Sequence, residues 1–239
     1  MLTFKVLSLL LRYPTAEIHE ALPEMRSVLE RERLLPEAAQ HEVRSFIEEL
    51  MALDLIRAQE RYVELFDRGR KLSLHIFEHT HGESRERGPA MVQLMTHYQD
   101  CGFELDAREL PDYLPLVLEF LAERSVMEAR EMLGEAIPVV TLVAARLRER
   151  DSRYAVLLEA LEAFVGISAE ERAELHRQVA EEGPDEAIVN MDKIWEEEAV
   201  SFTQESALAS SSKGGGADVQ PVQWDVGMRR KVPAQGSNT

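Results

Sequence analysis

Apolar residues recur every three to four positions through the first two hundred residues of the chain. This spacing is that of an α-helix with one buried face, and it predicts an all-α fold of about ten helices. The apolar faces are Leu55, Tyr62 and Phe66; Met91, Met95 and Tyr98; Val139, Leu142, Val143 and Leu147; and Ile188, Met191, Trp195, Ala199 and Phe202.

Start and stop signals divide this pattern into separate helices. Ser168 with Glu171 is typical of a capping box, and Asp112 suits an N-cap. Pro138 stands inside an apolar stretch and predicts a kink or break after Ile137. The remaining signals are Pro36 and Pro184 for first turns, and Gly166 and Gly183 for helix ends.

One segment, Asp67–Gly88, departs from the helical pattern. It is dense in Arg, His and Glu, and its apolar residues Leu72, Leu74 and Ile76 alternate with polar ones. We expect a long loop with one helical turn. Such a segment inside a helical domain is more often functional than idle, because a loop presents side chains that packed helices bury.

The composition changes abruptly near residue 204. Ser210–Ser212 and Gly214–Gly216 are followed by scattered Pro and Asn with little apolar content. The sequence therefore predicts a helical domain over residues 1–203 and a flexible, low-complexity, disordered tail over 204–239. The tail carries four basic residues against three acidic ones, so the net negative charge belongs to the helical domain.

Charge and cysteine content restrict the possible partners. Forty-four acidic against 27 basic residues give a net charge of -17. Such a surface repels phosphate backbones and anionic lipid headgroups, so we expect no nucleic-acid partner and favour basic ones. The single Cys101 allows no internal disulfide. The apolar run Val6–Leu11 lacks the flanks of a signal peptide, and no run approaches the length of a membrane span, so we expect a cytoplasmic protein without membrane insertion.

Candidate catalytic chemistry is sparse. His75, Glu78, His79, His81 and Glu83 form the one cluster of metal-ligand type, but Thr80 between His79 and His81 makes these two diverge. Cys101 with His97 lacks a third, orienting group, and no nucleophile elbow or phosphate-binding glycine motif occurs. We therefore predict no catalytic residue, no metal and no cofactor. A metal-dependent enzyme using His79, His81 and Glu83 is the alternative.

The acidic C-terminal helices suggest a binding function. Glu181, Glu182, Asp185, Glu186 and Glu196–Glu198 form either a solvated face or the rim of an apolar groove. Such a groove suits a basic amphipathic helix, with apolar anchors in the groove and Lys or Arg on the rim.

Five motifs in order give the chain a family resemblance. They are YVELFDRGR at Tyr62–Arg70, FEHTHGESRERG at Phe77–Gly88, ELPDYLP at Glu109–Pro115, RERDSRYAVL at Arg148–Leu157 and WEEEAVSF at Trp195–Phe202. Together they resemble the NarJ family of nitrate reductase assembly chaperones, within the TorD-like redox-enzyme maturation proteins, over residues 1 to about 203.

The resemblance implies a non-enzymatic, all-helical chaperone in the cytoplasm. Its implied client is the apo catalytic (alpha) subunit of respiratory nitrate reductase, including the basic N-terminal segment of that subunit. The chaperone would keep the client competent for molybdenum cofactor insertion before membrane docking, with molybdenum cofactor biosynthesis proteins as further partners. A generic helical adaptor that binds through its tail, with Trp224 as anchor, is another alternative.

The motifs also imply where a client peptide binds. We expect a groove bordered by Asp67–Gly88 and the helix that begins at Asp112. Tyr62, Phe66 and Leu114 would form its apolar floor, and Glu83, Glu109 and Asp112 would hold the Lys or Arg of the peptide. Tyr113 departs from the family pattern, which usually has His there. The expected peptide-binding residues are Tyr62, Phe66, Asp67, His79, His81, Glu83, Arg85, Arg87, Glu109, Pro111, Asp112, Tyr113 and Leu114.

Overall fold

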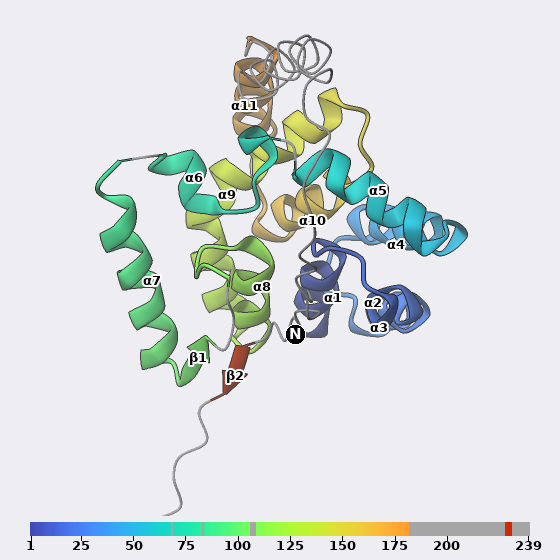
Figure 1. Ribbon diagram of the computed structural model, residues 1–239, viewed down its shortest axis with the longest axis horizontal. Helices are drawn as coiled ribbons and strands as arrows, with labels where there is room; N and C mark the ends of the chain where they lie inside the picture. Colours follow the sequence, from blue (N-terminus) through green and yellow to red (C-terminus); the bar gives the residue numbers. More distant parts are fainter. Residues whose placement is uncertain (68, 83, 106–108, 182–227, 231–239) are drawn as a thin grey trace, which may run out of the picture. The chain divides into compact units, whose positions relative to one another are not determined.

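The chain folds into packed helices with one short two-stranded sheet, as the computed structural model shows (Figure 1). The structure describes residues 1–67, 69–82, 84–105, 109–181 and 228–230, which all belong to one compact unit. Over these residues the all-α prediction is confirmed. In chain order the elements are α1 (Leu2–Leu10), α2 (Ala16–Glu20), α3 (Leu22–Glu32), α4 (Glu37–Ala52), α5 (Leu55–Phe66), the 3-10 turn η1 (Arg70–Leu72), α6 (Ile76–Thr80), α7 (Arg87–Asp100), β1 (Phe103–Leu105), α8 (Leu114–Ala122), α9 (Val126–Glu149), α10 (Ala155–Val165), α11 (Ala169–Glu181) and β2 (Met228–Arg230).

Helix α8 is apolar on almost every side. Every residue of α8 except Glu119 is buried, as expected of a helix with no solvent-facing stripe. Helix α1 packs along it, and the buried Ser8 hydroxyl donates to the carbonyl of Pro115 at 2.6 Å. This bond satisfies a polar group that burial would otherwise leave without a partner.

The longest helix, α9, carries the rest of the core. It begins with a capping box in which Ser125 and Glu128 each accept the other's backbone N–H. It packs against α10 and α11, and α10 also packs against α4. The expected break after Ile137 is wrong, because α9 runs through Pro138 without interruption. Ile137, Val139 and Val140 are buried around the proline, and their packing offsets the hydrogen bond that it removes.

Two predicted helix ends are confirmed and one is wrong. Ser168 and Glu171 form a reciprocal capping box, with both bonds at 3.1 Å, and Gly166 ends α10 with φ of 88°. Asp112 does not cap α8, whose N-cap is Tyr113. Pro36 lies one residue before α4. The other signals, Gly183, Pro184, the acidic residues from 182 onward and the apolar face from Ile188 to Phe202, lie outside the described residues.

The segment expected as a loop, Asp67–Gly88, holds one 3-10 turn and the five-residue helix α6. Its alternating residues Leu72, Leu74 and Ile76 are all buried. His75, between them, forms an isolated antiparallel bridge with Tyr113. The alternation therefore marks an extended stretch that is attached to the start of α8.

Helix α7 is packed far less completely than its neighbours. Of its fourteen residues only Tyr98 is buried, whereas Met95 is 38% and Val92 is 57% exposed. The expected apolar face of Met91, Met95 and Tyr98 is thus only partly covered. In Figure 1, α7 lies at the edge of the bundle beyond α8.

A short antiparallel sheet follows α7. Strand β1 pairs with β2, with Phe103 opposite Arg230, Glu104 opposite Arg229 and Leu105 opposite Met228. Strand β2 belongs to the segment expected as a flexible tail. The rest of that segment lies outside the described residues. None of the described helices is long and apolar enough to cross a membrane.

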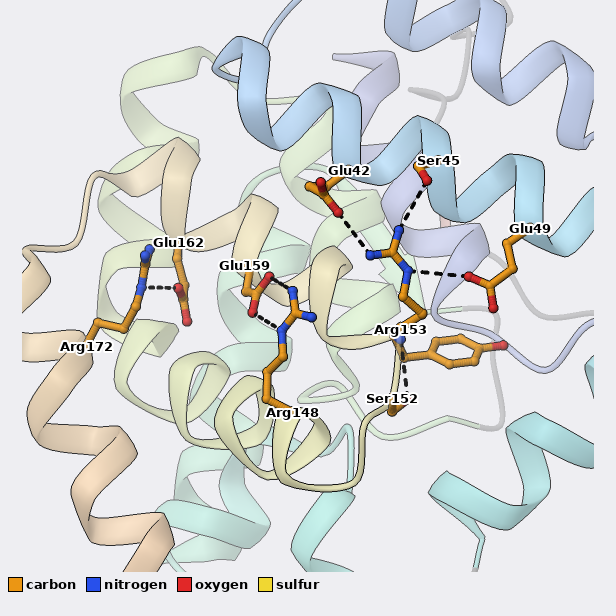
Figure 2. Close-up of polar contacts among 10 residues, drawn as sticks. Glu42, Ser45, Glu49, Arg148, Ser152, Arg153, Glu159, Glu162 and Arg172 are labelled. Carbon is orange, nitrogen blue, oxygen red and sulfur yellow. Dashed lines mark hydrogen bonds and ion pairs between the residues drawn. The ribbon is translucent and has the colours of Figure 1, made fainter.

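Arg153, in the turn between α9 and α10, binds side chains of α4 (Figure 2). The guanidinium of Arg153 donates to Glu42 at 3.0 Å, to Ser45 at 3.3 Å and to Glu49 at 3.4 Å. Nearby, Arg148 makes a two-bond contact with Glu159 between α9 and α10. Arg172 of α11 forms an ion pair with the buried Glu162 of α10, with Nε 2.8 Å from Oε2; Figure 2 shows this contact.

Because Arg153 binds three side chains of another helix, we expect Arg153→Ala to lower the free energy of unfolding by about 1 to 2 kcal/mol. The matched control is Arg57→Ala, since among the described residues Arg57 forms an ion pair only with Glu60 of its own helix, and its side chain is 71% exposed. We expect this control to change stability by less than about 0.5 kcal/mol. Urea unfolding of both variants measures the difference, and equal losses would contradict the bridging role of Arg153.

Candidate functional site

The buried carboxylate of Asp112 connects two distant parts of the chain. Asp112 is 0% exposed, and its Oδ2 accepts the backbone N–H of Phe77 at 2.9 Å. Phe77 lies in the first turn of α6, where a backbone N–H has no partner within the helix. Asp112 therefore caps α6, and this explains why it does not cap α8.

Backbone hydrogen bonds also connect the start of α6 to the start of α8. Ile76 N–H donates to the carbonyl of Asp112 at 3.1 Å, and Leu114 N–H donates to the carbonyl of Leu74 at 2.8 Å. Together with the Asp112 cap they fix the position and direction of α6 relative to α8.

His75 lies against the other oxygen of Asp112. Its Nδ1 is 3.3 Å from Asp112 Oδ1, and its ring lies 5.2 Å from that of Tyr113. Burial alone lowers the pKa of His75, but the bond to Asp112 and the charges of Asp112, Glu78 and Glu109 outweigh it. The pKa of His75 is therefore raised above its ordinary value of 6.5.

The apolar residues expected as a groove floor are packed in the interior. Tyr62 and Leu114 are buried and Phe66 is half-buried. The Tyr62 hydroxyl donates to the carbonyl of Leu11 at 3.0 Å, and its ring lies 4.8 Å from that of Phe66. Pro111 is also buried, and its carbonyl accepts the Tyr98 hydroxyl at 2.9 Å. These contacts hold α5 and α7 to the core.

The polar residues expected to bind the peptide do not share one set of contacts. His79 Nε2 lies 2.8 Å from the carbonyl of Ser73 and must donate to it, so Nδ1 accepts from Arg146 at 3.3 Å. Arg87 pairs with Glu78 at 3.2 Å. Arg85 and Asp67 are exposed, Glu109 is half-buried, and Glu83 lies outside the described residues.

No metal centre is formed among the residues that the structure describes. Across them, no group of three or more His, Cys, Asp or Glu side chains lies close enough together to hold a metal ion. The two nitrogens of His79 face Ser73 and Arg146.

An open groove of about 600 Å³ lies beside α6. Helix α7 forms one wall and α9 the other, and side chains from α6 and α8 close the ends and floor. The lining residues are Phe77, His81, Ala90, Gln93, Leu94, His97, Cys101, Phe120, Arg124, Glu128, Glu131, Met132 and Glu135.

The groove combines an apolar floor with an acidic wall. Phe77, Leu94, Phe120 and Met132 supply apolar surface, whereas Glu128, Glu131 and Glu135 of α9 are exposed. These three acids are spaced by three and four residues, so they lie on one face of α9. We call this surface the α7–α9 groove.

One cation lies at an end of the α7–α9 groove. The guanidinium of Arg124 lies 5.0 Å from the ring of Phe120 and 5.2 Å from that of Phe103. Stacking on the two rings fixes Arg124 at the end nearest β1.

Of the expected peptide-binding residues that the structure describes, His81 is the one that lines this groove. The lining residues of α7 and α9 are not among those expected from the sequence. Two signals in the sequence could have found them: exposed apolar residues on α7, and the spacing of Glu128, Glu131 and Glu135 beside Met132.

The chain is similar to known proteins over most of its length. Residues 15–178 match the model of the nitrate reductase delta subunit family. The chain is 41% identical over 214 residues to the nitrate reductase molybdenum cofactor assembly chaperone NarJ of Escherichia coli K12, covering 89% of each protein. It is 36% identical to the probable chaperone NarW of the same strain, over 89% of this chain and 88% of NarW. It is also 36% identical to a probable NarJ of Bacillus subtilis, over 67% of this chain and 86% of that protein. These relatives are named as chaperones, a role without catalysis.

The raised pKa of His75 predicts how stability depends on pH. The protonated imidazole is favoured in the folded state, so its contribution is present in full below about pH 6.5 and is lost as the pH rises through the folded-state value. We expect the free energy of unfolding to fall over that interval more steeply in the natural protein than in His75→Gln. Urea unfolding at a series of pH values measures both. Parallel curves for the two proteins would contradict the His75–Asp112 interaction.

Proposed function

Because the chain belongs to the nitrate reductase delta subunit family, with relatives that are NarJ-type assembly chaperones, we propose that it is a dedicated chaperone for respiratory nitrate reductase. It binds the apo catalytic subunit, including the basic N-terminal segment of that subunit. It keeps this client receptive to the molybdenum cofactor until the client docks at the membrane. The chaperone acts in the cytoplasm, alongside the proteins that make the cofactor.

The α7–α9 groove is the observation that supports peptide binding. An amphipathic helix binds by placing its apolar side chains, spaced by three and four residues, in a hydrophobic groove. Phe77, Leu94 and Met132 offer that surface, and the side chains of the described residues leave the groove open.

The acidic wall selects the charge of the peptide. Glu131 and Glu135 are exposed and four residues apart. Arg124, the one arginine or lysine among the described lining residues, is stacked on two aromatic rings. Complementary charge raises the rate of encounter and rejects acidic peptides. A segment with Lys or Arg on one face and apolar residues on the other therefore fits this groove.

The family motifs have two roles in this proposal. Asp112, Tyr113, Leu114 and the aromatic side chains of α5 act from the interior, by fixing α6 so that Phe77 and His81 lie at the groove. Asp67 and Arg85 are exposed and can contact other parts of the client. A charge reversal at the buried Asp112 would unfold α6 and could not report on peptide binding.

We expect Glu131→Lys with Glu135→Lys to weaken binding of a synthetic peptide that copies the N-terminal segment of the catalytic subunit by about 10-fold, because two attractive charges become repulsive. The matched control is Glu20→Lys with Glu24→Lys, which makes the same charge change at exposed positions on α2 and α3. Calorimetric titration measures both dissociation constants. The natural protein should also bind more weakly as salt rises.

Equal losses in the two double variants would mean that only net charge matters, and the groove would be excluded as the site. No binding by the natural protein at any salt concentration would contradict recognition of the N-terminal segment.

A further inference from the structure

The charged side chains of the α7–α9 groove are ordered along its length. Arg124 lies just before α9, and Glu128, Glu131 and Glu135 follow it on one face of that helix. With the rise of an α-helix, the three acids extend over about 10 Å of α9. One end of the groove is therefore positive, and the wall beyond it is negative.

The neighbouring elements identify the two ends of the groove. Helix α7 runs from α6 to β1 along one wall (Figure 1). On the other wall, Arg124 lies 5.2 Å from the Phe103 ring of β1, whereas Arg146, farther along α9, is 3.3 Å from His79 of α6. The two wall helices thus run in opposite directions, with Arg124 at the β1 end and Glu135 towards the α6 end.

Arg124 is held in place without an ion-pair partner among the residues that the structure describes. Its guanidinium lies over two aromatic rings, and within this part of the chain its buried Nε has no hydrogen-bond acceptor. The carboxylate of Glu123 pairs with Lys5 at 2.8 Å. The carboxylate of Glu128 accepts the Ser125 N–H at 2.9 Å. The positive end of the groove is therefore fixed in position and suited to an acceptor from another molecule.

We propose that the groove binds the client helix in one direction, an inference that rests on the proposed function. The carbonyls at the C-terminal end of a helix carry partial negative charge, and the N–H groups at its N-terminal end carry partial positive charge. The C-terminal end of the client helix therefore lies at Arg124, and its N-terminal half lies along Glu131 and Glu135.

Arg124 is the residue that determines this direction. A guanidinium donates several hydrogen bonds in a fixed geometry, so it can bind the last carbonyls of the client helix or an acidic side chain in its last turn. The Lys or Arg side chains of the client that meet the acidic wall then belong to the N-terminal half of the bound segment.

A spin label at one end of the client peptide tests the direction on the natural full-length chain. Met91 lies in the second turn of α7, on the α6 side, and Met127 lies three residues after Arg124 in the first turn of α9. A label at the N-terminus of the peptide should broaden the ¹³C-labelled methyl signal of Met91 more than that of Met127. A label at the C-terminus should do the reverse. The opposite pattern, or equal broadening from both labels, would overturn the single direction.

The chemical form of the peptide C-terminus tests Arg124 itself. A peptide with a free C-terminal carboxylate should bind the natural protein about 3-fold more tightly than the same peptide with an amide, because the carboxylate attracts the guanidinium. Arg124→Gln should abolish this preference. The matched control is Arg130→Gln, since Arg130 also lies over an aromatic ring, that of Phe164 at 5.3 Å, but is not among the described lining residues. It should keep the preference.

The outcomes distinguish this inference from the proposed function. Tighter binding of the amide form, or a carboxylate preference that survives Arg124→Gln, would overturn the role of Arg124 while the chaperone function stands. No binding of either peptide form by the natural chain would contradict recognition of the N-terminal segment, and the direction would fail with it.

Discussion

The cap that Asp112 provides for α6 is the contact on which the rest of the candidate site depends. A fully buried carboxylate is costly unless its oxygens are bonded, and here one accepts the Phe77 N–H and the other faces His75. A five-residue helix has little stability of its own. Its position therefore comes from this cap and from the backbone bonds between Leu74–Ile76 and Asp112–Leu114. Phe77 and His81 line the groove because α6 is held there.

The two sides of α6 differ in packing, and this difference suits a binding protein. Towards α5 and α8 the aromatic and apolar side chains of the family motifs are closed into the core. Towards α7 the packing is incomplete, with a single buried residue on a fourteen-residue helix. Regions with few buried contacts are the ones that open or adapt at low cost. Because α6 is held in place while the neighbouring α7 is loosely packed, the groove can adjust to a peptide and the fold is kept.

Features that depend on neighbouring residues could be predicted from the sequence, whereas contacts between distant segments could not. The capping box at Ser168, the glycine end at Gly166 and the buried alternation of Leu72, Leu74 and Ile76 all follow from neighbouring residues. Asp112 looked like a cap for the helix that follows it, but it caps one that begins 36 residues earlier, which no local pattern reveals. The groove was missed for the same reason, because its walls come from α7 and α9. At Pro138 the low helix propensity of proline gave the wrong prediction. The burial of the apolar residues on both sides of it outweighs the backbone hydrogen bond that proline cannot donate.

The most direct test of the account is the response of the methionine methyl groups to the client peptide. Met132 lines the α7–α9 groove, whereas Met25 is buried in α3 and serves as an internal reference. In a spectrum of protein labelled with ¹³C at the methionine methyl groups, titration with the N-terminal segment of the nitrate reductase catalytic subunit should move the Met132 signal and leave that of Met25 in place. A bound peptide that leaves Met132 unchanged would contradict the assignment of the groove as the client-binding site.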